Sequence, residues 1–174
     1  IDGGVQITAS HNPKEDNGIK LQVRNADAYS GGSLQKLYKK IVQEDVLTGE
    51  GMVEEIDAVT PYLNHVCALF PDIGDGMNIV IDSGNGVAGP VYKEAACIVG
   101  ASVTGLFIEP DGTFPNHAAD PSKYDTLKDL QASVKDTASD MGLAFDGDGD
   151  RLGLVDENGV IRTADEILLL LARD

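Results

Sequence analysis

Three aspartates alternate with glycine in the segment 146–151, which reads DGDGDR. The glycines allow the backbone to turn so that Asp146, Asp148 and Asp150 can face one point. Three carboxylates held this close repel one another, and one or more would take up a proton unless a cation lay between them. Because all of these donors are oxygens, the segment predicts a site for Mg²⁺, Ca²⁺ or Mn²⁺ and not for zinc.

Two other structures fit part of this pattern. In an EF-hand loop the three aspartates would be the first ligands and Glu157 the last one, but Arg151 stands where that loop requires glycine. An acidic turn in solvent is the second alternative. Arg151 also suits an anion lying beside a metal, since a guanidinium can hold two phosphate oxygens.

A second polar segment, 8–13, reads TASHNP, and NGIK follows at 17–20. It offers Ser10 as a candidate nucleophile. Ser10 and His11 are adjacent, and neighbours on a loop rarely point at each other. No third member of a triad and no G-x-S-x-G turn accompanies them, so the segment does not predict a serine hydrolase. A polar turn and a reactive site both stay open on these residues alone.

Two further loops are rich in turn residues. The segment 109–117 reads EPDGTFPNH and is typical of a turn-rich loop. The segment 83–89 reads SGNGVAG, and it could bind phosphate at the start of a helix. Its glycine spacing also matches a dinucleotide fingerprint, but no acidic residue ends a second strand about twenty residues on. We therefore favour a tight strand-to-helix turn.

The elements that must position these loops follow a βαβ pattern. Strands are predicted at 78–82, 101–108, 141–145 and 152–155, with helices from about 89 to 100 and from a cap at Ser122. This order indicates a parallel α/β sheet. The loop 146–151 then lies at the carboxyl end of a strand, where α/β folds place their sites.

The flanking sections are predicted from caps and apolar spacing. The section 1–72 has a strand before Ser10, a strand at 19–23, a helix capped by Ser33 and a helix starting at Thr60. The section 73–157 is the α/β part. The section 158–174 opens with a capping box at Thr163 before an apolar helix.

Composition excludes several classes of partner. The formal net charge is −16, from 29 acidic and 13 basic residues, so nucleic acid and anionic membranes are not expected partners. No apolar run is long enough to span a membrane. Cys67 and Cys97 fit apolar helical patterns and are predicted to be buried free thiols in a reducing cytoplasm. The chain starts at Ile1 without a signal peptide, and we expect it to be part of a longer protein.

Taken together and in this order, the four loops resemble the α-D-phosphohexomutase family. TASHNP with NGIK resembles its phosphoserine loop, DGDGDR its metal loop, and the segments 81–89 and 109–117 parts of its second domain. The resemblance covers the whole chain and favours the phosphomannomutase/phosphoglucomutase branch. It implies an α/β fold with mixed, largely parallel sheets and flanking helices: domain 1 in part (1–72), domain 2 (73–157) and the start of domain 3 (158–174).

The resemblance also implies a role for particular side chains. Ser10 would carry the phosphoryl group, with His11 and Lys20 near it and Lys20 as general acid/base. Arg151 would support the phosphoserine. The implied magnesium ligands are Ser10, Asp146, Asp148 and Asp150.

The implied reaction interconverts hexose 1-phosphate and hexose 6-phosphate of mannose or glucose. It proceeds through a bisphosphorylated intermediate and needs Mg²⁺ and an activator of the glucose 1,6-bisphosphate type. The expected partners are the hexose phosphate substrate and the missing domains 3 and 4 of the same chain, so this segment alone is expected to be inactive. Three alternatives stay open: a phosphoglucosamine mutase, a Mg²⁺- or phosphate-binding module without turnover, and a HAD-like phosphatase. The phosphatase would need an aspartate nucleophile on an early strand, where this chain offers Ser10.

Overall fold

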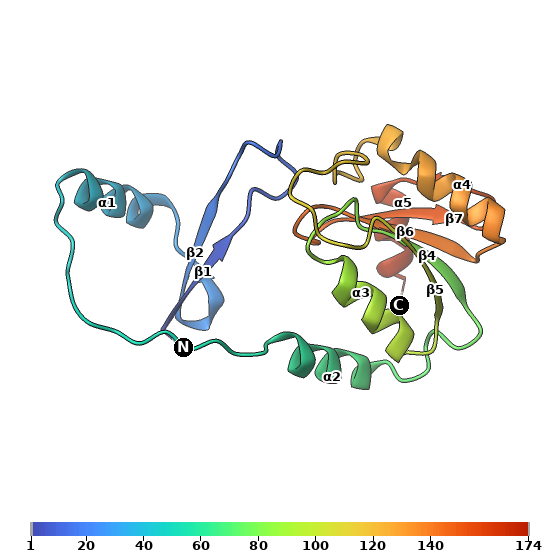
Figure 1. Cartoon of the computed structure of the whole chain (residues 1–174), viewed down its shortest axis with the longest axis horizontal. Helices are drawn as coiled ribbons and strands as arrows, with labels where there is room; N and C mark the ends of the chain where they lie inside the picture. The colour runs from blue at the N-terminus through green and yellow to red at the C-terminus, as the bar shows by residue number, and fades with distance from the viewer. Residues whose placement is uncertain (1, 174) are drawn as a thin grey trace. The chain divides into compact units, whose positions relative to one another are not determined.

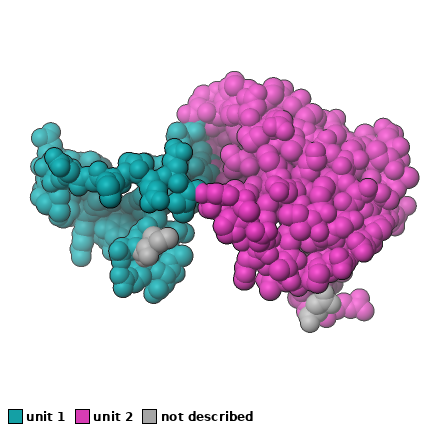
Figure 2. Space-filling view, turned by 60° about the horizontal axis from the view of Figure 1, so that its bottom comes forward, with its two compact units in different colours: residues 1–9, 16–56 teal, residues 10–15, 57–174 magenta. Residues whose placement is uncertain are grey.

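The protein is described here from a computed structural model, which covers residues 2–173. The outermost predicted bounds, Ile1 and Asp174, lie outside the described residues. The chain forms two compact units (Figure 2). Unit 1 comprises Ile1–Ala9 and Asp16–Ile56, and unit 2 comprises Ser10–Glu15 and Asp57–Asp174. The short segment that carries Ser10 therefore belongs to the same unit as the aspartate loop.

Unit 1 contains a small antiparallel sheet and one helix. Its elements are β1 (Gly3–Ile7), β2 (Ile19–Val23), a 3₁₀ turn (Arg24–Ala26), β3 (Asp27–Ala28) and α1 (Gly31–Val42). The prediction that Ser33 caps this helix is wrong. The backbone leaves its extended conformation after Ser30, so Ser33 already lies in the first turn and donates its N–H to the Ser30 carbonyl (3.3 Å).

Unit 2 is built on a mixed five-stranded sheet of order β5-β4-β6-β7-β8 (Figure 1). The strands are β4 (Asn78–Asp82), β5 (Ser102–Leu106), β6 (Met141–Phe145), β7 (Leu152–Asp156) and β8 (Ile161–Arg162). β5, β4 and β6 run parallel, as predicted, whereas β7 and β8 are antiparallel. Since a parallel connection needs a long crossover, the short loop between β6 and β7 permits only a hairpin.

Two helices make the crossovers of this sheet. α3 (Gly89–Ile98) joins β4 to β5, and a 3₁₀ turn (Tyr124–Leu127) followed by α4 (Lys128–Thr137) joins β5 to β6. The two crossovers run in opposite directions along the sheet, and right-handed crossovers therefore place α3 and α4 on opposite faces, as Figure 1 shows. The carboxyl ends of β4 and β6 are neighbours where the direction reverses, which is the usual site position in open α/β sheets.

The core of unit 2 lies between α4 and the sheet. It consists of side chains with almost no exposed surface: Val80, Leu127, Leu130, Val134, Ala144 and Val155. The helical members follow the period that puts them on one face. The helix itself starts later than predicted, because the Ser122 hydroxyl donates to Asp120 and a 3₁₀ turn intervenes before Lys128.

Two outer helices complete unit 2. α2 (Val59–Leu69) packs against α3, so α2 belongs to unit 2 although the predicted boundary near residue 72 grouped it with the first section. α5 (Ala164–Leu171) starts with the predicted capping box, in which the Thr163 hydroxyl accepts from the Glu166 N–H and the Glu166 carboxylate accepts from the Thr163 N–H. Among residues 2–173, no helix combines the length and apolar character required to cross a membrane.

The two cysteines differ in their surroundings. Cys67 is buried on α2, as predicted, and its thiol contacts the carbonyl of Ala95 (3.8 Å). Cys97 is exposed, so its predicted burial is wrong. It lies near the end of α3, where the apolar periodicity continues although nothing in the described part of the chain covers it.

Candidate functional site

The aspartate loop follows β6 directly, and its three carboxylates converge. Asp146, Asp148 and Asp150 each offer an oxygen within 4.8 Å of the other two. The predicted convergence is confirmed, whereas their role as metal ligands stays a prediction. Gly149 has φ +77°, a left-handed conformation that glycine adopts without strain. The loop joins two antiparallel strands, so it lacks the flanking helices of an EF-hand.

The loop after β4 and the helix α3 both donate hydrogen bonds to the backbone of the aspartate loop. The Val87 N–H donates to the Gly147 carbonyl (3.0 Å), and the Tyr92 hydroxyl on α3 donates to the Gly149 carbonyl (2.7 Å). A Cβ on Gly86 would lie only 2.9 Å from the Gly147 oxygen, so this close approach requires glycine. These contacts support the tight-turn interpretation of the segment 83–89.

The electrostatics of Asp146 favour a cation beside it. The residue is fully buried, and burial raises the pKa of its carboxyl group. The charges of Asp148 and Asp150 raise this pKa further, while hydrogen bonds from the Arg151 N–H (3.0 Å) and the Ser10 hydroxyl oppose the rise. A hard divalent cation among the three carboxylates would offset both causes, and an all-oxygen donor set suits Mg²⁺. The residues present therefore fit the implied metal.

Ser10 lies against this loop, although 136 positions separate it from Asp146 in the sequence. Its hydroxyl donates to Asp146 Oδ2 (3.2 Å) and is 3.3 Å from His11 Nδ1. The backbone of Ser10 has φ +55°, a conformation that costs a non-glycine residue about 1–3 kcal/mol and tends to occur at functional sites. A Cβ on Gly147 would lie 2.4 Å from the Ser10 carbonyl oxygen, which shows how closely the two backbones approach.

Arg151 joins the two loops. One end of its guanidinium hydrogen-bonds His11 Nδ1, and its Nε lies 3.7 Å from Asp146 Oδ2. The positively charged guanidinium of Arg151 therefore lies beside His11, the residue that follows Ser10. The structure brings six predicted residues together within unit 2: Ser10, His11, Asp146, Asp148, Asp150 and Arg151. Lys20 lies on β2 of unit 1, and its place in the site stays a prediction.

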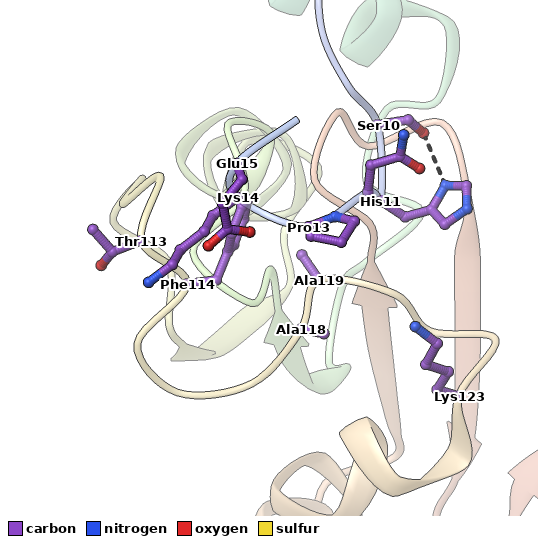
Figure 3. A pocket seen from close by; sticks show the side chains of 11 residues that line it. Ser10, His11, Pro13, Lys14, Glu15, Thr113, Phe114, Ala118, Ala119 and Lys123 are labelled. Carbon is purple, nitrogen blue, oxygen red and sulfur yellow. Dashed lines mark hydrogen bonds between the residues drawn. The ribbon is translucent and has the colours of Figure 1, made fainter. Parts of the chain in front are cut away.

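A cavity of about 310 Å³ adjoins the Ser10 loop (Figure 3). Its walls are Ser10, His11, Asn12, Pro13, Lys14, Glu15, Thr113, Phe114, Ala118, Ala119 and Lys123. The sequence indicated only a turn-rich loop at 109–117 and gave no functional role to Phe114 or Lys123. A run of turn residues between two strands of a βαβ unit was the available signal, but it does not show which loop lies beside Ser10.

The loop that lines this cavity is tied to the end of β4. His117 Nε2 lies 3.1 Å from Oδ2 of Asp82, which is almost fully buried. The hydrogen bond to Asp82 raises the pKa of His117, although burial opposes the shift. Asn116 donates to the Asn85 side chain (2.8 Å), whose amide in turn donates to the Glu109 carbonyl (2.8 Å). These contacts fix the cavity wall to the same sheet edge as the aspartate loop.

Fold and site together define an α/β protein with an acidic loop at the reversal of its sheet and a serine held against that loop. The family domain described as "Phosphoglucomutase/phosphomannomutase, alpha/beta/alpha domain II" matches residues 60–159. The corresponding "domain I" matches residues 1–47. The chain belongs to the phosphoglucomutase/phosphomannomutase family.

Individual relatives agree with this assignment. The chain is 42% identical over 173 residues to a phosphomannomutase/phosphoglucomutase of Pseudomonas aeruginosa, covering 98% of this chain and 36% of the relative. It is also 42% identical to a phosphoglucomutase of Neisseria meningitidis, with 98% and 37% covered. The crystal structure of a phosphoglucomutase/phosphomannomutase family protein from Burkholderia thailandensis superposes with a TM-score of 0.91 at 39% identity, over 99% of this chain and 37% of that one. The chain thus spans little more than a third of the length of these relatives.

Proposed function

We propose that this chain is the phosphoserine- and metal-carrying part of a phosphosugar mutase that interconverts hexose 1-phosphate and hexose 6-phosphate of glucose or mannose. The observation that carries the proposal is the position of Ser10. Its hydroxyl is 3.2 Å from Asp146, one of three converging carboxylates. His11 does lie beside Ser10, but its imidazole contacts the Arg151 guanidinium, whereas the base of a serine hydrolase is oriented by a carboxylate.

In this proposal Ser10 holds a phosphoryl group between turnovers. A hydroxyl of the sugar monophosphate attacks that phosphorus, the bond from phosphorus to Ser10 Oγ breaks, and Lys20 takes the hydroxyl proton. The bisphosphate then reorients in the site, and its other phosphoryl group is transferred to Ser10 Oγ. The contacts of His11 with Ser10 and with Arg151 support a role for both residues in holding phosphoryl oxygens, because positioning and charge balance are the main requirements of phosphoryl transfer.

Mg²⁺, held by the three aspartates and by the phosphate on Ser10, would neutralise the developing charge of the transferred group. The contribution of this chain is the geometry. The buried Asp146 fixes one ligand, and the hydrogen bonds to the carbonyls of Gly147 and Gly149 hold the loop that carries the others.

We further propose that the chain contains part of domain 1, followed by domain 2, and that residues 158–174 begin domain 3; α2, which packs against α3, is counted in domain 2. The anchor for the non-reacting phosphate and the groups that select the sugar would then belong to domains 3 and 4 of the same polypeptide. The length of the relatives supports this division of labour. A hexose 1,6-bisphosphate as activator and a cytoplasmic location complete the proposal.

The experiment is transfer of one phosphoryl group onto the purified intact protein, that is, this chain together with the domains proposed to follow it. We expect that incubation with Mg²⁺ and glucose 1,6-bisphosphate adds the mass of one phosphoryl group at Ser10, mapped by peptide mass spectrometry. Ser10→Ala should abolish the added mass, whereas Ser33→Ala, in an exposed part of α1, should leave it unchanged. Phosphorylation elsewhere in the chain, or persistence in Ser10→Ala, would refute the assignment. In the intact protein Ser10→Ala should also lose most mutase activity.

A further inference from the structure

Asp120 is a buried carboxylate that the proposed function leaves without a role. It follows the cavity-lining loop, and only 3% of its surface is exposed. Aspartates are seldom buried this completely unless charged or polar groups surround them. The groups around Asp120 therefore indicate why a carboxylate is present at this position.

The local contacts of Asp120 are those of a turn. Its Oδ1 accepts from the Ser122 hydroxyl (2.6 Å) and the Ser122 N–H (3.2 Å). An asparagine oxygen would accept the same two hydrogen bonds, so they require a polar side chain but not a charge. Oδ2 is 3.3 Å from Lys123 Nζ, but the lysine side chain is 63% exposed, against 40% for Arg151, and an ion pair contributes less the more it is in contact with solvent.

The remaining partner of Asp120 is Arg151. The arginine Nη1 lies 3.9 Å from Asp120 Oδ1, while its Nε lies 3.7 Å from Asp146 Oδ2. The guanidinium thus lies between two nearly fully buried carboxylates, one from the aspartate loop and one from the segment after the cavity. Its third contact is with His11 beside Ser10.

We infer that Asp120 is a positioning residue whose negative charge holds the Arg151 guanidinium beside His11 and Ser10. Without that charge, the buried carboxylate of Asp146 remains beside the arginine, 3.7 Å from its Nε, and the guanidinium moves onto it. In that position the guanidinium neutralises Asp146, which the proposed function needs as a ligand of the cation. It also no longer lies beside Ser10, where it would contact the phosphoryl group. The consequence for catalysis rests on the proposed function, whereas the position of Arg151 does not.

The first arm of the test observes Arg151 directly. The chain has four arginines, so its ¹⁵N side-chain Nε–Hε spectrum is simple, and Arg151→Lys assigns the signal. We expect a high heteronuclear NOE for Arg151 in the unaltered chain, and in Asp120→Asn a clear change in the Arg151 Nε and Hε chemical shifts at an NOE that stays high, because the guanidinium moves onto Asp146 and does not become free. The matched control is Asp125→Asn, which removes a carboxylate that is 89% exposed and paired with Lys128 (2.7 Å). The control should leave the signal unchanged.

Two results of this arm would overturn the inference. One is an Arg151 signal that Asp120→Asn leaves in place. The other is loss of the folded spectrum in Asp120→Asn, because asparagine keeps both hydrogen bonds from Ser122, and unfolding would show that Asp120 acts on the fold and not on Arg151.

The second arm measures phosphoryl transfer from glucose 1,6-bisphosphate to Ser10. We expect Asp120→Asn to slow the transfer about tenfold or more, since small misplacements of catalytic groups have effects of this order. In an Arg151→Met background the same change should have no further effect. An equal loss in both backgrounds would contradict action through Arg151. This arm uses the intact protein; if that protein takes up no phosphoryl group at Ser10, the proposed function fails, and the NMR arm still decides the role of Asp120.

Discussion

Replacing Gly147 with alanine tests whether the close approach of the serine loop and the aspartate loop is essential to unit 2. The added Cβ would lie 2.4 Å from the Ser10 carbonyl oxygen, far inside the distance of about 3.5–4.0 Å at which non-bonded carbon atoms attract. Overpacking of this kind costs about 1–3 kcal/mol. Alanine also restricts the unfolded chain, which stabilises a protein by about 0.4–1 kcal/mol where its conformation is allowed.

Gly112→Ala is the matched control for this change. Gly112 has no atom within 4 Å of its added Cβ, and neither glycine has a positive φ, so the unfolded-state gain cancels between the two variants. The difference is then the steric cost of about 1–3 kcal/mol. At about 2–4 °C per kcal/mol for a chain of this size, Gly147→Ala should melt about 2–12 °C below Gly112→Ala.

Differential scanning calorimetry without metal measures this difference, and the rate of Ser10 phosphorylation reports on the site. We expect Gly147→Ala to lower both the Tm and the rate, because the Ser10 carbonyl must move away from the loop. If the two alanine variants have the same Tm and the same rate, the serine loop does not lie against Gly147, and the site geometry described above is wrong.

Two further predictions concern contacts that hold the loops. The pKa of His117 is raised in the fold by Asp82, so its contribution is complete below its ordinary pKa of about 6.5 and is lost as pH rises through the higher folded value. The Tm should therefore fall between about pH 6 and pH 9 more steeply in the unaltered protein than in His117→Gln, and parallel curves would contradict this. Tyr92→Phe removes the hydrogen bond to the Gly149 carbonyl, worth about 0.5–1.5 kcal/mol, but keeps the ring against Phe145. We expect calorimetric titration to show severalfold weaker Mg²⁺ binding, and an unchanged affinity would mean that the tyrosine does not hold the loop.

Local features of the fold were predictable from the sequence. The strands at 78–82 and 141–145 have the predicted bounds because each is a short apolar run that ends in a polar or glycine-rich loop. The capping box at Thr163 was also predictable from local sequence, because both of its partners lie within one helical turn. Ser33 and Ser122 failed as caps because a capping side chain alone does not fix where the backbone becomes helical.

The features of the site likewise fall into those that local sequence predicts and those that depend on contacts between distant segments. The convergence of Asp146, Asp148 and Asp150 was predictable because alternation with glycine is a property of six consecutive residues. The approach of Ser10 was expected only from resemblance, since no local pattern connects positions 10 and 146. Asp120 was not predicted at all, because its contact with Arg151 depends on how a loop after β5 meets a loop after β6.

The local aspartate–glycine pattern and the contacts between distant segments have different physical roles in this site. The glycine-separated aspartates bring together like charges, which is unfavourable by itself and raises the pKa of the buried Asp146. The contacts between distant segments act against that cost: Arg151 supplies a positive charge, and the hydrogen bonds to the carbonyls of Gly147 and Gly149 fix the loop. Since one guanidinium cannot neutralise three carboxylates, the loop retains negative charge. This negative charge favours the binding of a cation, and the fold places the Ser10 hydroxyl 3.2 Å from Asp146, one of the three converging carboxylates.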